Sequence, residues 1–160
     1  MIRVLDDGDR RRVAEFFRER WGSDRVVSRG RLHHVAELPG YVAVSDDVGR
    51  IEGLVTYLIE GEECEVVTLD AVEQGRGTGT ALLERVVDAA GDAGCRRVHL
   101  VTTNDNMRAL RFYQRRGFRL VALHAGALDR SRELKPEIPA TGKHGIPLSD
   151  ELVLARDLSG

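Results

Sequence analysis

One stretch decides the fold: VVTLDAVEQGRGTGT, residues 66–80. Its first four residues are β-branched or apolar and predict a strand, and residues 81–90, ALLERVVDAA, predict a helix. A strand that passes through a glycine-rich turn into a helix suits an anion, because the first N–H groups of a helix have no partner inside it. The glycines can take positive φ and let a phosphate approach the backbone, and Arg76 could add a charged donor.

Two familiar glycine motifs do not fit this turn. A Walker loop needs four residues between its glycines and then Gly-Lys-Ser/Thr, which the chain lacks. A dinucleotide fingerprint, Gly-x-Gly-x-x-Gly, fails at its third glycine, which falls on Thr80 or on Leu82. A nicotinamide or nucleotide enzyme is therefore a weak alternative.

A third pattern, Gln/Arg-x-x-Gly-x-Gly/Ala, is satisfied by Gln74, Gly77 and Gly79. In this the chain resembles the GNAT superfamily of N-acetyltransferases, in which the turn holds the pyrophosphate of acetyl-coenzyme A. The motif is short, so a tight turn that binds nothing is the alternative.

A second GNAT signature, Asn-x-x-Ala-x-x-x-Tyr-x-x-x-Gly-Phe, follows the next predicted strand, residues 97–102. The chain matches every fixed position, with Asn106, Ala109, Tyr113, Gly117 and Phe118. Steps of three and four residues place these side chains near one face of a helix. We expect Asn104 or Asp105 to cap this helix and Gly117 to end it in the left-handed conformation.

The resemblance implies an α/β fold with a central mixed, mostly antiparallel sheet of about six to seven strands and helices on both faces, as one domain over residues 1–160. It implies an acetyl-coenzyme A-dependent N-acetyltransferase that passes the acetyl group directly to a primary amine. Tyr113 occupies the position of the acid that protonates the thiolate. The residues expected at the cofactor are Ala71, Val72, Gln74, Gly75, Arg76, Gly77, Thr78, Gly79, Thr80, Asn106, Ala109 and Tyr113.

Two departures from the family pattern leave the pantetheine contacts open. The link from Leu69 to Gly77 is about two residues shorter than the common form, and the usual proline is absent.

Family members often carry a general base on the strand before the glycines, where Glu65 is the best match. Strand alternation puts Glu63 on the same face and Asp70 on the other. His33, His34 and His144 are alternatives, since imidazole titrates near neutrality, although each reads better as a surface residue.

Composition bounds the remaining possibilities. A formal net charge of −2 gives no electrostatic reason to propose nucleic acid or a membrane as partner. No apolar stretch is long enough to span a bilayer and the start is not a signal peptide, so we expect a cytoplasmic protein. Cys64 and Cys95 are expected to be reduced and buried. The five histidines show no metal-ligand spacing, and no metal is predicted.

Hydrophobic periodicity predicts the other elements. Strands are expected at residues 2–5, 41–44, 51–59, 118–123 and, as a closing edge strand, 151–158; a helix is expected at 10–20. Residues 26–27 could be a strand and 31–38 a short helix. Residues 125–141 read as an excursion rather than a linker, because they carry two prolines and three basic residues, Arg130, Arg132 and Lys135.

The acceptor is left open by the sequence, as are the roles of residues 21–38 and 125–151. Trp21, His33, His34 and Tyr41 could line a pocket, with Glu63, Asp150 and Glu151 attracting a cationic amine. The acceptor could be a small amine or a peptide, and a homodimer is equally open. A non-catalytic acyl-coenzyme A sensor is the competing function, although a sensor has no need of a proton donor at Tyr113.

Overall fold

The computed structural model describes residues 1–158, which divide into two compact parts. The first part contains Met1–Val26, His34–Val98 and Leu158, and the second contains Val27–His33 and His99–Asp157. The last two residues of the predicted 1–160 domain lie outside the described residues.

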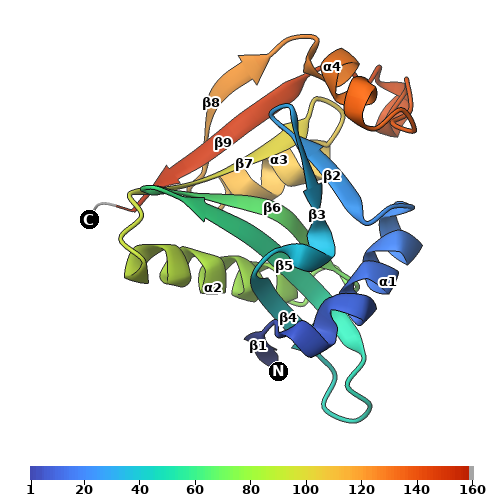
Figure 1. The fold of residues 1–160 in the computed structure, drawn as a ribbon. Helices are drawn as coiled ribbons and strands as arrows, with labels where there is room; N and C mark the ends of the chain where they lie inside the picture. The colour runs from blue at the N-terminus through green and yellow to red at the C-terminus, as the bar shows by residue number, and fades with distance from the viewer. Residues whose placement is uncertain (159–160) are drawn as a thin grey trace. The chain divides into compact units, whose positions relative to one another are not determined.

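The strands and helices bear out the predicted fold class (Figure 1). Seven strands contribute to a mixed, mostly antiparallel sheet, together with four α-helices. In the first part the strand order is β1-β4-β5-β6, with β1 at Ile2–Val4, β4 at Gly40–Val44, β5 at Ile51–Glu60 and β6 at Glu63–Ala71. In the second part the order is β7-β9-β8, with β7 at Arg97–Thr103, β8 at Arg119–His124 and β9 at Glu151–Asp157.

Two helices cover opposite faces of the first part's sheet. Helix α1, Arg10–Trp21, buries Val13 and Phe17 against Leu54 of β5. Helix α2, Thr78–Asp92, packs on the other face, where a Cβ added to Gly53 would lie 2.9 Å from Leu82 Cδ1. Because Leu54 and Gly53 are neighbours on one strand, their side chains point to opposite faces. Helices on both faces are thus confirmed.

The pairing of β5 with β6 contains a bulge. Thr56 pairs with Thr68 but Tyr57 pairs with Val66, so that Val67 has no partner across the ladder. An extra residue shifts the in–out alternation of the strand by one position. Glu65, Thr68 and Asp70 therefore lie opposite Leu58, Thr56 and Leu54, on the face that α1 covers. The expectation that Asp70 points away from the Glu65 face is wrong, because simple alternation holds only for a strand without a bulge.

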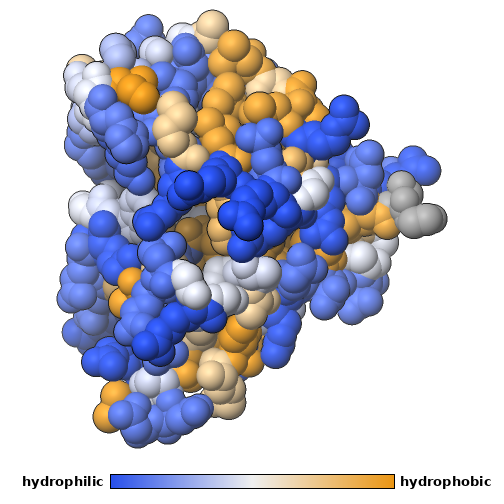
Figure 2. All heavy atoms as spheres, turned by 180° about the vertical axis from the view of Figure 1, so that it is seen from behind, coloured by the Kyte–Doolittle hydropathy of each residue, from blue (hydrophilic) through white to orange (hydrophobic). Residues whose placement is uncertain are grey.

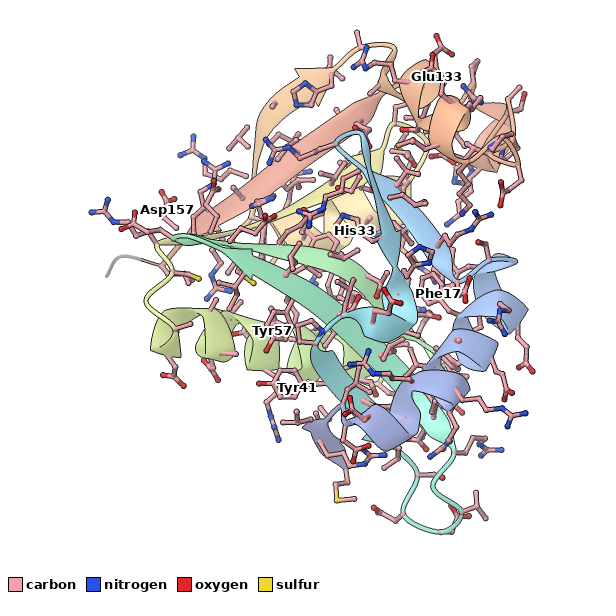
Figure 3. All side chains as sticks on the ribbon, in the orientation of Figure 1. Phe17, His33, Tyr41, Tyr57, Glu133 and Asp157 are labelled. Carbon is pink, nitrogen blue, oxygen red and sulfur yellow. The ribbon has the colours of Figure 1, made fainter. Side chains whose placement is uncertain are left out.

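The α2 face carries an aromatic pair. Tyr41 and Tyr57 stack with their ring centroids 6.2 Å apart, and Figure 3 shows the two rings side by side. The guanidinium of Arg85 on α2 lies 5.8 Å from the centre of the Tyr41 ring. Tyr41 therefore serves the packing of α2.

In the second part, β9 lies between β7 and β8, and β8 forms the sheet edge. The prediction of β9 as a closing edge strand is wrong; its burial on both faces, with Val153, Leu154 and Ala155 in the core, gives the physical reason. Strand β8 exposes Leu120, Val121 and Leu123 instead. Figure 2 shows hydrophobic atoms gathered over the same region of the molecule.

Residues 31–38 and the excursion after β8 differ from the predicted secondary structure. The expected helix at residues 31–38 is instead strand β3, Arg31–His34, followed by a 3-10 turn at Val35–Glu37. Strand β3 pairs with β2, Arg25–Ser28, through a turn in which Arg29 and Gly30 both have positive φ. The excursion after β8 contains helix α4, Ala127–Leu134, which periodicity did not single out.

Cys64 and Cys95 are both free and buried, as predicted, and burial raises the pKa of the Cys64 thiol to about 12. Within residues 1–158, every helix falls short of the length and apolar character needed to cross a membrane.

The contact of α2 with β5 predicts a stability effect. Gly53→Ala should destabilise the protein by about 1–3 kcal/mol, because the new Cβ would meet Leu82, Thr78 and the backbone oxygen of Asp70 within 2.9–3.1 Å. Urea unfolding with an unchanged m-value would measure the loss.

Gly91→Ala is the matched control. Gly91 lies in the last turn of α2 with open space around it, so this variant should stabilise the protein by about 0.5–1 kcal/mol. Equal free energies of unfolding for the two variants would contradict the proposed close approach at Gly53.

Candidate functional site

The glycine turn joins β6 to α2 as an exposed loop. Residues 72–77 are all exposed, and the side chain of Gln74 donates from Nε2 to the oxygen of Ala71 at 3.1 Å. Gly75 and Gly77 both have φ of +79°, a conformation that L side chains rarely adopt. The sequence therefore needs glycine at these two positions for backbone conformation.

Gly77 is the N-cap of α2 and has no side chain to cap the helix. The first helical hydrogen bond runs from Ala81 N to Gly77 O at 2.9 Å, and Thr78, Gly79 and Thr80 make up the first turn. A Cβ built on Gly75 or on Gly77 would meet nothing within 4 Å. The loop thus offers backbone donors, the positive end of a helix dipole and open space, which together fit a diphosphate.

Arg76 is engaged within the loop. Its Nε lies 2.5 Å from Glu73 Oε2, and both side chains are well exposed. A surface pair of this kind contributes little stability, so an incoming phosphate could displace the carboxylate and take over the guanidinium.

The N–H groups of Ala71 and Val72, both predicted to face pantetheine, point to opposite sides of β6. The N–H of Val72 donates to Glu52 O at 2.9 Å and is already engaged with β5. In an antiparallel ladder successive residues direct their N–H groups to opposite sides, so those of Ala71 and Leu69 point away from β5. Leu69, which the sequence reasoning missed, therefore joins Ala71 as a candidate donor in place of Val72.

The second signature forms helix α3, Met107–Gln114, in the second part. Asn106 is its N-cap and accepts a hydrogen bond at Oδ1 from Ala109 N at 3.1 Å. The expectation that Asn104 or Asp105 caps this helix is wrong. The cap leaves the amide nitrogen of Asn106 as its donor group toward a ligand.

Asn104 and Asp105 hold another segment instead. Asn104 Oδ1 accepts from the backbone N–H groups of Ser149 and Asp150 at 3.1 and 3.0 Å, and the buried Asp105 accepts from Lys143 N at 2.9 Å. These bonds tie residues 143–150 to the residues directly before the Asn106 cap.

Tyr113 lies in the last turn of α3 and is 7% exposed. Its ring makes edge contacts with Phe112 and Phe118, at centroid distances of 5.1 and 5.5 Å. Gly117 ends the helical segment with φ of +87°, as predicted, and Phe118 N returns to Tyr113 O at 3.1 Å. Burial raises the pKa of the Tyr113 phenol well above its ordinary value, and Arg116 offsets part of this effect.

The candidate bases differ in exposure. Glu65 is half-buried on the α1 face of β6, and Glu63 lies exposed on the same face. His34 and His144 are exposed, as expected, but His33 is only 5% exposed. The surface assignment of His33 is therefore wrong, because the β2–β3 turn packs within the second part.

Buried polar residues also gather in the second part. His99 and Glu151 are 6% and 3% exposed, and both lie close to Arg29 of the β2–β3 turn. Arg29 N donates to Glu151 Oε2 at 3.4 Å, and its guanidinium Nη1 lies 3.5 Å from His99 Nε2. Hydrophobic periodicity could not identify His99 as a candidate, because one histidine within a predicted strand adds no periodic signal.

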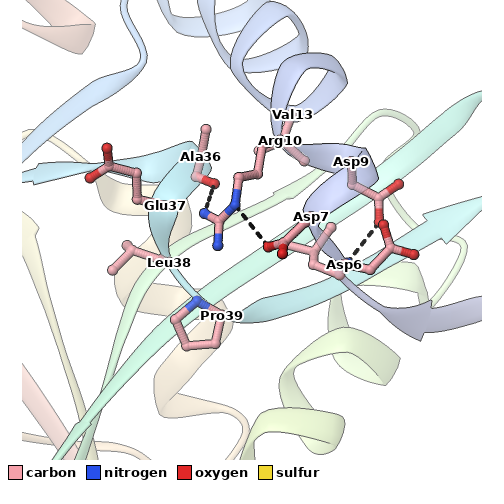
Figure 4. Close-up of a pocket in the computed structure, with 10 residues that line it drawn as sticks. Asp6, Asp7, Asp9, Arg10, Val13, Ala36, Glu37, Leu38 and Pro39 are labelled. Carbon is pink, nitrogen blue, oxygen red and sulfur yellow. Dashed lines mark hydrogen bonds and ion pairs between the residues drawn. The ribbon is translucent and has the colours of Figure 1, made fainter.

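A cavity of about 240 Å³ opens elsewhere in the first part, beside the start of α1 (Figure 4). Arg10 in its wall donates to Ala36 O at 2.7 Å and to Asp7 at 3.1 Å, and Asp9 forms two hydrogen bonds of 2.7 Å with Arg3. None of the residues that line it belongs to the predicted site. These hydrogen bonds link the start of α1 to β1 and to the 3-10 turn at Val35–Glu37.

The strand, the uncapped glycine turn and helix α2 of the first part form an α/β unit whose exposed backbone donors fit a diphosphate. The chain belongs to the acetyltransferase (GNAT) family, whose model matches residues 10–118. The uncharacterized protein YxbD of Bacillus subtilis is 42% identical over 146 residues, which are 91% of each chain.

Two solved structures share the fold. An acetyltransferase of Bacillus subtilis in complex with CoA has a TM-score of 0.68 at 19% identity, over 99% of this chain and 98% of that one. A GNAT family acetyltransferase from Elizabethkingia anophelis with acetyl-CoA bound has a TM-score of 0.70 at 18% identity, over 99% and 97%. The exposed glycine turn, with room for a ligand at both glycines, fits such a donor.

Substitutions at Gly77 test the loop. Asparagine and aspartate both tolerate positive φ and have the same size, so they differ in charge alone. Gly77→Asp should bind coenzyme A about tenfold or more weakly than Gly77→Asn, because its carboxylate would repel the diphosphate. Isothermal titration of both variants, after circular dichroism has shown that they fold, measures the difference. Equal affinities would place the diphosphate elsewhere.

Proposed function

We propose that this protein is an acetyl-coenzyme A-dependent N-acetyltransferase that transfers the acetyl group directly to a primary amine of a small molecule, peptide or protein. Membership of the GNAT family supports the acyl transfer. Direct attack needs a neutral amine, a polarised carbonyl and a proton for the departing thiolate. The chain offers a residue for each requirement.

Tyr113 is the observation that carries the proposal. A phenol keeps its proton at physiological pH, and burial raises the pKa of Tyr113 further above that range. A phenol in that state donates its proton, or a hydrogen bond, to the thiolate that leaves when the C–S bond breaks. An acyl-coenzyme A sensor has no use for such a group.

Donor binding is assigned to two segments. The backbone of residues 74–80 holds the diphosphate, and the amides of Leu69 and Ala71 polarise the thioester carbonyl. Asn106 contributes its amide N–H₂, and Ala109 allows close approach. Val72, whose N–H is engaged with Glu52, contributes only its exposed side chain.

Glu65 is proposed as the general base. It is half-buried on the α1 face of β6, and a carboxylate there can take the proton that the attacking nitrogen loses as the C–N bond forms. Cytoplasmic location and assembly into a homodimer complete the proposal; the exposed apolar residues of β8 support the homodimer.

Tyr113→Phe tests the acid. The variant should keep acetyl-coenzyme A affinity nearly intact and lower turnover by about a hundred- to ten-thousand-fold, the range for the loss of a general acid. Thiol release with a broad amine panel measures turnover, and isothermal titration with acetyl-coenzyme A, coenzyme A and NAD measures binding.

The dependence of turnover on pH provides a second test of Tyr113. Because burial raises the pKa of Tyr113, the folded protein keeps this proton above pH 10, where an ordinary tyrosine loses it. Wild-type turnover should therefore show no loss centred near pH 10. Unchanged turnover in Tyr113→Phe would remove Tyr113 from this role, whereas a wild-type loss near pH 10 that the variant lacks would contradict the raised pKa and keep Tyr113 as the acid.

A further inference from the structure

Trp21, the single tryptophan of the chain, is held firmly although it is 52% exposed. It is the last residue of α1, and its ring stacks on the buried Phe17 with a centroid distance of 5.8 Å and an interplanar angle of 23°. Its indole Nε1 donates to Asp70 Oδ2 at 3.3 Å. One face of the indole is therefore packed and oriented, and the side chain still presents half of its surface to solvent.

Asp70 holds this arrangement on the sheet. Its carboxylate is buried and accepts two hydrogen bonds from Arg20, one from Nε and one from Nη2, the latter at 3.0 Å. A buried carboxylate is costly without such a partner. Two consecutive residues of α1 are thus tied to one position on β6, and the orientation of the indole is set by a bidentate ion pair as well as by ring stacking.

Asp70 lies between the two residues whose amides are proposed to polarise the thioester, Leu69 and Ala71. The bulge at Val67 turns the Asp70 side chain to the face that α1 covers. The oriented indole is therefore hydrogen-bonded to the same three-residue segment of β6 that is proposed to hold the reacting carbonyl. An acceptor that approaches this segment over the α1 face meets the exposed side of Trp21.

We propose that Trp21 determines acceptor specificity and that the acceptor is a monoamine with a flat aromatic or other apolar body. This inference rests on the proposed function. The two arginines nearest the indole are engaged in ion pairs, Arg20 with Asp70 and Arg18 with Asp24 at 2.9 Å, so the indole is the oriented and exposed surface at this end of α1. An indole face binds apolar bodies and attracts one ammonium group, and the two ion-paired arginines add no net negative charge that would recruit a second one.

The single tryptophan makes the proposal directly measurable. Wild-type protein saturated with coenzyme A is titrated with phenethylamine while the tryptophan emission is recorded. Phenethyl alcohol retains the ring without the amine, and ethylamine retains the amine without the ring. Phenethylamine should change the emission saturably, phenethyl alcohol more weakly and ethylamine not at all.

Kinetics with acetyl-coenzyme A and phenethylamine provide the second measurement. Trp21→Ala should raise KM for phenethylamine about tenfold, the usual effect of removing an aromatic anchor, and leave KM for acetyl-coenzyme A unchanged. Val48→Ala is the matched control, since Val48 is a 72%-exposed apolar residue in the β4–β5 turn. It should change neither constant.

Three results would overturn the proposal while the proposed function stands. One is normal coenzyme A binding by isothermal titration with no phenethylamine-dependent change in emission. A second is acetylation of ethylamine as efficient as that of phenethylamine, and a third is a KM for phenethylamine that Trp21→Ala leaves unchanged. Absence of any coenzyme A binding would overturn the proposed function and this inference together, and the titration distinguishes that case from the other three.

Discussion

A single unpaired residue, Val67, sets the geometry on which the candidate site depends. With this bulge, Glu65, Thr68 and Asp70 all face α1, and the N–H groups of Leu69 and Ala71 point away from β5. Without the bulge, the side chains of Glu65 and Asp70 would lie on opposite faces of the sheet. One extra residue thus places the proposed base, Glu65, on the same face as the Asp70–Trp21 contact, while the N–H groups of Leu69 and Ala71 lie in the plane of the sheet.

The face that the bulge creates is unusually polar for one covered by a helix. Thr56 and Thr68 satisfy each other through a hydroxyl–hydroxyl hydrogen bond of 2.6 Å, and Asp70 is satisfied by Arg20 and Trp21. Buried polar groups without partners would cost stability, so each is paired. Apolar residues would serve equally well if this face had only to pack against α1. The polar residues instead suit a face that also meets a polar reactant.

The elements that the sequence predicts correctly are those whose signal is local. Positive φ at Gly77 and Gly117, helix α2 and the β4–β5 hairpin follow from glycine placement and hydrophobic period. The predicted cap of α3 falls one or two residues early, because Asn104, Asp105 and Asn106 are all good caps and the choice depends on which of them hold residues 143–150. The bulge, the buried His33 and the inner position of β9 depend on contacts distant in sequence, which no period records.

This difference has a physical cause that bears on function. A diphosphate is held by backbone N–H groups and a helix dipole, and the glycines that permit this leave a short, readable motif. An acceptor is met by side chains that the fold brings from separate elements, as it brings Trp21 of α1 to Asp70 of β6 across 49 residues. Members of one family can therefore share the donor motif and differ in acceptor. Specificity in this chain has to be sought where an oriented, exposed side chain meets the backbone of the donor strand, and Trp21 is such a side chain.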